Sequence, residues 1–121
     1  MPPSGPTRKS PILAFTDALH LVFEAIKLAE KGLEMNPSKE EERALNETLG
    51  ELERKRAELQ AKLDALISQS RQFPGPTAQQ VAEVSRLTGE VEAVTNASIT
   101  ASRAVALTSR VLALATKVAA G

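Results

Sequence analysis

Residues 10–38, SPILAFTDALHLVFEAIKLAEKGLEMNPS, contain the pattern of one complete helix together with its start and stop signals. Ser10 can cap the free backbone N–H groups, and Pro11 suits the first helical position because its missing donor would have no partner there. Asn36 ends the helix, since the residue before Pro37 is pushed out of the helical region. Apolar residues recur at steps of three and four: Ile12, Phe15, Leu19, Val22, Ile26, Ala29 and Leu33. A second apolar stripe widens this face: Leu21, Leu28 and Met35. We therefore predict a helix over residues 11–35 that is covered on two flanks.

A second helix is predicted over residues 38–72. Ser38 and Glu41 have the spacing of a capping box, in which each side chain accepts a hydrogen bond from the backbone of the other. A narrow seam follows at steps of four and three: Leu45, Leu49, Leu52, Arg56, Leu59, Leu63 and Leu66. A charged seam residue sets the register of two helices when it finds a partner on the other helix. We single out Arg56 as this register-setting polar residue; the alternative is that its side chain extends along the bundle edge to solvent.

A third helix is predicted over residues 78–119, after the turn Phe73-Pro74-Gly75-Pro76 and a second capping box at Thr77 and Gln80. The apolar face of its second half is centred on Val111. This face is rotated from that of the first half by more than heptad drift, which is roughly 20° per heptad. Residues 95–100, TNASIT, are poor helix formers. The alternative to one continuous helix is therefore a kink or a break near Asn96, and a break would give a fourth helix.

The predicted fold class is therefore all-α. We expect an up-down-up bundle of three long, coiled-coil-like helices, or of four helices if the third is broken near Asn96. Residues 1–10, MPPSGPTRKS, have almost nothing to bury and read as a flexible tail. Residues 11–121 are expected to form a single helical-bundle domain, because the chain has 121 residues and sits near the commonest domain size.

Composition argues against several classes of protein. Fifteen basic residues balance fifteen acidic ones, so no nucleic-acid partner is expected. The chain has no cysteine, which excludes disulfides, thiol nucleophiles and thiolate metal sites and leaves the cellular compartment open. No uncharged apolar run approaches the roughly 20 residues that span a bilayer, so we expect a soluble protein without a membrane helix. Asp17 and His20 interrupt the one signal-like apolar stretch; a cytoplasmic location is favoured, and export without a cleaved signal peptide is the alternative.

No residue is predicted to be catalytic, and neither a cofactor nor a metal is expected. His20 is the one histidine of the chain and shares a helix face with Asp17 and Glu24, which is typical of a solvated surface. A second histidine is lacking, and so are the Glu-x-x-His pairs of carboxylate-bridged metal centres in helical bundles. We therefore predict a protein that is not an enzyme.

The second half of the third helix is the predicted interaction site. Its apolar arc covers close to half of the helix circumference, and we expect part of it to stay uncovered because this helix would overhang its neighbours. The residues predicted to bind a protein partner or a second copy of the chain are Ala101, Ala104, Val105, Leu107, Val111, Leu112, Leu114 and Val118. The predicted function is thus a non-enzymatic helical-bundle interaction module.

The alternative function is an exported or surface-associated helical protein, either a secretion-system component or a binder of lipid or granule surfaces. Arg103, Arg110 and Lys117 are spaced seven apart opposite the apolar arc, and no acidic residue follows Glu92. Such a basic, amphipathic segment can lie on a polar–apolar boundary.

Residues 25–37, AIKLAEKGLEMNP, together with Leu49-Gly50, resemble a fragment of a tetratricopeptide repeat. The helix-Asn-Pro-Ser-helix turn is also similar to the hairpin of type III secretion needle subunits. No repeat recurs at the expected period, and the helix predicted over residues 38–72 is too long for that repeat. Both resemblances therefore reflect turn chemistry that many helical hairpins share.

Overall fold

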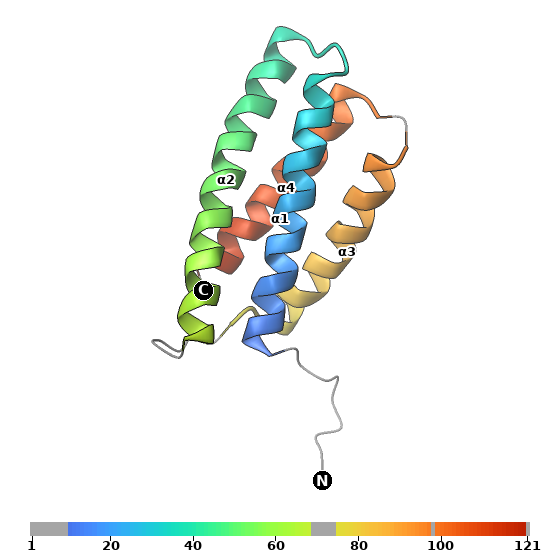
Figure 1. The fold of residues 1–121 in the computed structure, drawn as a ribbon. Coiled ribbons are helices and arrows are strands. Elements are labelled where there is room, and N and C mark those ends of the chain that lie inside the picture. The colour runs from blue at the N-terminus through green and yellow to red at the C-terminus, as the bar shows by residue number, and fades with distance from the viewer. Residues whose placement is uncertain (1–9, 69–74, 98, 121) are drawn as a thin grey trace.

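The computed structural model describes residues 10–68, 75–97 and 99–120. Within these ranges the chain is entirely helical and turn, without strands, which confirms the all-α prediction. The described helices are α1 (Pro11–Leu33), α2 (Lys39–Ile67), α3 (Ala78–Thr95) and α4 (Ala101–Ala120) (Figure 1). The prediction of three helices is therefore wrong, and the alternative with a break near Asn96 is what the structure shows.

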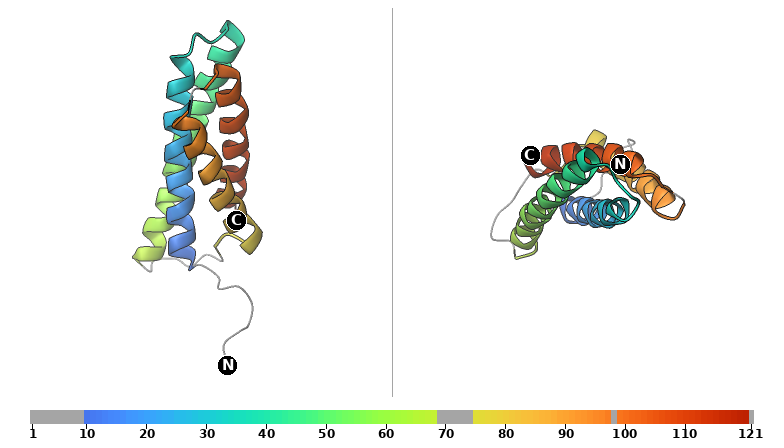
Figure 2. Two further views of the ribbon diagram at one scale, coloured as in Figure 1. Left: turned by 90° about the vertical axis from the view of Figure 1, so that its right-hand side faces the viewer. Right: turned by 90° about the horizontal axis from the view of Figure 1, so that it is seen from above.

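Helix α1 lies at the centre of the arrangement. Figure 1 shows α1 and α3 running upward and α2 and α4 running downward, with α2 and α3 on opposite sides of α1. Helix α4 crosses behind α1, as the view from above confirms (Figure 2). Among the described residues, α1 contacts all three other helices, whereas α4 packs on α1 and α2 and meets α3 only slightly.

The predicted N-terminal signals are confirmed at three helices. The Ser10 hydroxyl accepts a hydrogen bond inside the first turn of α1. At α2, the Ser38 hydroxyl accepts from the Glu41 backbone at 3.1 Å, and the Glu41 carboxylate accepts from the Ser38 backbone at 2.9 Å. The same reciprocal pair forms between Thr77 and Gln80 at α3. Side-chain caps therefore set where these helices begin, because they satisfy backbone donors that the helix itself cannot.

The helix ends differ slightly from the prediction. Helix α1 stops at Leu33, two residues before the predicted end, and Asn36 then adopts a left-handed conformation with φ of 51° ahead of Pro37. Asparagine tolerates this conformation better than most residues, which suits the turn into α2. The predicted end of the second helix, 69–72, and residues 1–9 of the predicted tail lie outside the described residues.

The break between α3 and α4 is stabilised from both sides. The Lys31 ammonium of α1 donates to the backbone carbonyls of Thr95 and, at 3.3 Å, of Ala97, where the end of α3 leaves acceptors free. The Thr100 hydroxyl accepts from the Arg103 backbone at 3.1 Å and so caps the start of α4. The prediction of a continuous helix over 78–119 is wrong. The Lys31 and Thr100 hydrogen bonds stabilise the end of α3 and the start of α4, and both helices then pack on α1.

Gly32 marks a close approach between α1 and α4. A Cβ atom built on Gly32 would lie 2.6 Å from the Cβ of Ala104 in α4 and 3.2 Å from a methyl carbon of Leu45 in α2. Real Cβ atoms do not tolerate the first distance, so the three helices can meet here only because residue 32 has no side chain.

We expect Gly32→Ala to lower the free energy of unfolding by about 1 to 3 kcal/mol, because the added methyl group overpacks the junction of three helices. Gly50→Ala is the matched control, since nothing lies within 4 Å of a Cβ at Gly50 in the middle of α2. That change should stabilise the protein by about 0.5 to 1 kcal/mol through helix propensity alone. Urea denaturation followed by circular dichroism measures both. Equal shifts of the two variants in the same direction would contradict the close approach.

Candidate functional site

The residues predicted to bind a partner lie on the side of α4 that faces the other helices. Those buried within the single chain are Ala101, Ala104, Leu107, Val111, Leu114 and Val118. Val105 and Leu112 are half-buried at the edge of this face and pack against the core. The expectation of an uncovered arc is wrong, because the break near Asn96 turns α4 back over α1 and α2, which cover it.

The α4 face is a dry, closely packed surface. Thr108 is fully buried in it, and its hydroxyl donates to the Ala104 carbonyl of the preceding turn at 2.6 Å. Among the described residues, no buried side-chain nitrogen or oxygen lacks a hydrogen-bond partner. The attachment of α4 therefore depends mainly on apolar burial and shape.

The polar edge of α4 adds an ion pair with α3. The Arg110 guanidinium donates to the Glu90 carboxylate, with a nitrogen–oxygen distance of 3.2 Å. Both side chains are partly exposed to solvent, at 47% and 33%. Exposed ion pairs contribute about 0 to 1 kcal/mol to the free energy of unfolding, so this pair stabilises the packing of α4 only weakly.

Charged residues placed on the buried side of α4 should unfold the protein. Leu107 and Leu114 are 2% and 5% exposed, so Leu107→Glu plus Leu114→Glu would bury two carboxylates without partners. We expect loss of the helical signal or a collapse of the thermal midpoint. Ala106→Glu plus Ala113→Glu is the matched control, because these residues have the same spacing on the exposed side of α4. A folded Leu107→Glu plus Leu114→Glu protein, as stable as the control, would contradict this burial.

Arg56 is exposed and reaches across to α1. Its guanidinium carbon lies 6.0 Å from the centroid of the Phe23 ring, and the Lys27 ammonium lies 5.4 Å from the same centroid. The Phe23 residue is 45% exposed. The Arg56 side chain therefore extends along the bundle edge to an aromatic ring of the neighbouring helix, where a cation–π contact forms. Phe23 lies outside the apolar seam of α1, so the seam pattern does not predict its contact with Arg56.

We expect Arg56 and Phe23 to be energetically coupled. In a double-mutant cycle of Arg56→Ala and Phe23→Leu, the destabilisation of the double variant should fall short of the sum of the single ones by about 0.5 to 1 kcal/mol. Urea denaturation measures the four proteins. Additive effects would show that the arginine stem packs on α1 without using the ring.

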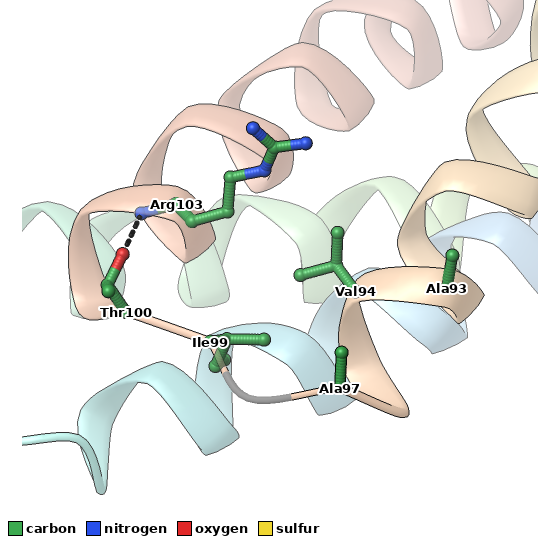
Figure 3. A pocket seen from close by; sticks show the side chains of 6 residues that line it. All are labelled: Ala93, Val94, Ala97, Ile99, Thr100 and Arg103. Atoms are coloured by element: carbon green, nitrogen blue, oxygen red, sulfur yellow. Dashed lines mark hydrogen bonds between the residues drawn. The ribbon is translucent and has the colours of Figure 1, made fainter.

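An open hollow of about 400 Å³ lies where α3 ends and α4 begins (Figure 3). Its lining residues are Ala93, Val94, Ala97, Ile99, Thr100 and Arg103. Figure 3 shows the Thr100 hydroxyl already engaged by the Arg103 backbone nitrogen. The described lining residues therefore offer apolar contact and the Arg103 guanidinium group, and they include no acid–base pair.

A cluster of three polar side chains, His20, Glu24 and Glu92, lies where α1 packs on α3. The His20 Nε2 atom lies 3.2 Å from a carboxylate oxygen of Glu92, and Glu24 lies one turn further along α1. One ligand atom from each of these three side chains lies within 4.8 Å of the other two. The sequence placed His20 beside Asp17 and Glu24, but it could not place Glu92, which is 72 residues away and approaches only because α3 packs on α1.

None of the described helices is long and apolar enough to cross a membrane. No protein-family model matches the chain, and no curated protein and no solved structure is significantly similar to it. The packing and chemistry of its own residues are therefore the basis for a functional proposal.

Proposed function

We propose that this chain is a non-enzymatic helical interaction module that binds a protein partner, or a second copy of itself, through the apolar face of α4. The observation that carries the proposal is that α4 packs on α1 and α2 and makes little contact with α3, the helix that precedes it. An amphipathic helix lying against two others is the geometry by which many proteins bind a partner helix. Here the chain occupies its own binding surface.

Exchange of α4 is the step that would expose this surface. If the turn around Asn96 straightens, α4 leaves α1 and α2, and a helix from another molecule can take the same place. A second copy offers an identical helix, so a swapped dimer would rebuild every contact of the closed chain. A foreign partner needs a helix with a similar apolar stripe and a small residue opposite Gly32, where Ala104 now lies.

The closed chain is the stable state in this proposal. Opening uncovers Leu107, Val111 and Leu114 together with their neighbours on α1 and α2, and this exposure of apolar surface is unfavourable. A partner therefore acts by binding the open state more tightly than α4 itself does. Binding should be slow, because it waits for α4 to leave.

Attachment to a lipid or granule surface through the basic side of α4 has less support. Arg103, Arg110 and Lys117 are exposed, but Arg110 already pairs with Glu90. The apolar residues that would enter such a surface are those buried against α1 and α2. Surface attachment would thus require the same release of α4 that protein binding requires.

A peptide of residues 99–120, labelled with a fluorophore and added to the intact chain, tests whether α1 and α2 accept a helix from outside. We expect saturable binding by fluorescence anisotropy, with a rate that rises in mild urea as the resident α4 opens more often. A peptide with Ala106→Glu plus Ala113→Glu should bind as well as the natural one. A peptide with Leu107→Glu plus Leu114→Glu should fail to bind.

Two outcomes would contradict the proposal. Binding of the Leu107→Glu plus Leu114→Glu peptide as tight as that of the natural peptide would show that the apolar face is not used. No binding of any peptide, under conditions where hydrogen exchange shows that α4 opens, would show that the surface does not accept a helix in trans. Light scattering of the full chain after refolding at high concentration then separates the self-partner from a foreign one.

A further inference from the structure

Three metal-binding side chains meet on the surface formed by α1 and α3. His20 and Glu24 are four residues apart on α1, so both side chains project from the same side of that helix. Glu92, near the end of α3, completes the group, and its carboxylate already contacts the imidazole at 3.2 Å. The arrangement thus combines two ligands from one helix with a third from its neighbour, and the packing of α3 on α1 positions it.

The distances in this cluster suit a first-row divalent ion. Zinc binds histidine nitrogen and carboxylate oxygen at about 2.0 to 2.2 Å, so adjacent ligand atoms in a tetrahedral site lie about 3.4 Å apart. The His20–Glu92 pair is close to that value, and the largest separation in the cluster, 4.8 Å, is within reach of a side-chain rotation at Glu24. Half of the His20 and Glu92 side-chain surface remains exposed, which leaves room for water as a fourth ligand.

The charges of the cluster also favour a cation. Two carboxylates lie within 4.8 Å of each other, and Glu24 is largely buried, with a side chain that is only 11% exposed. Among the described residues, the positive charge that pairs with Glu24 is the Lys27 ammonium at 3.3 Å, which is itself 48% exposed. A divalent ion between the three groups would neutralise both carboxylates at once, which a single lysine on one side of Glu24 does not do.

We infer that His20, Glu24 and Glu92 form a binding site for a divalent transition-metal ion of the zinc class, which clamps α3 to α1. The imidazole nitrogen selects such an ion over magnesium or calcium, because those ions prefer oxygen ligands alone. The ion binds the folded chain only, since Glu92 meets the other two ligands through tertiary packing. It therefore stabilises the protein and holds α3 in place. This inference rests on α1 and α3 and does not depend on the exchange of α4.

Titration of the tag-free chain with zinc chloride alone, followed by calorimetry, tests the site. We expect one ion per chain and a thermal midpoint that rises by about 5 °C at saturating zinc. Proton NMR gives a direct signature, because His20 is the one histidine of the chain and its imidazole signals need no assignment. These signals should shift on addition of zinc and stay unchanged in a large excess of magnesium.

His20→Ala and Glu92→Gln should each lower the zinc affinity by about tenfold or more, because each removes one of three ligands. Both residues are exposed, so the apoproteins should stay folded. Glu53→Gln, an exposed glutamate of α2, is the matched control and should leave the affinity unchanged. Zinc affinity in His20→Ala equal to that of the natural chain would overturn the inference, as would unchanged imidazole signals at millimolar zinc. A peptide-binding defect with intact zinc binding would bear on the proposed function alone.

Discussion

The contact between α1 and α4 at Gly32 is the constraint on which the rest of the structure depends. Without a side chain at this position, Ala104 of α4 and Leu45 of α2 can both approach the backbone of α1. The apolar face of α4 is then covered by α1 and α2 along its length. Apolar burial is the main favourable contribution to folding, so this close approach helps to decide whether the apolar face of α4 is buried or exposed.

The break near Asn96 is the second requirement, and α1 participates in it as well. Lys31 directly precedes Gly32. The Lys31 ammonium donates hydrogen bonds to backbone carbonyls at the end of α3 and just after it, and the missing side chain of Gly32 leaves room for α4. The capped end of α3 and the start of α4 are thus positioned by neighbouring residues of one helix. A chain that kept α3 and α4 continuous would place the two apolar faces where α1 could not cover both.

The two proposed activities therefore use different sides of the same central helix. One side of α1 joins α2 in holding α4, which is the surface proposed to exchange. The other side presents His20 and Glu24 to α3, where the proposed metal site lies. An ion at that site would leave α4 free to move while α3 stays on α1. Partner binding and metal binding could then occur together in one molecule, because they share a helix but no residues.

Local chemistry in the sequence was enough to predict where three of the four helices begin. Side-chain caps at Ser10, Ser38 and Thr77 act within four residues of the helix start, so neighbours along the chain decide these starts. Pro37 likewise excludes a helical conformation at Asn36, although α1 already ends at Leu33. The apolar face of α4 was also evident, since period and composition are local. Only the tertiary structure decided what covers that face, whether the break occurs, and that Glu92 meets His20. These outcomes depend on which helices pack together, and the spacing of residues along the chain does not determine the distance between two helices.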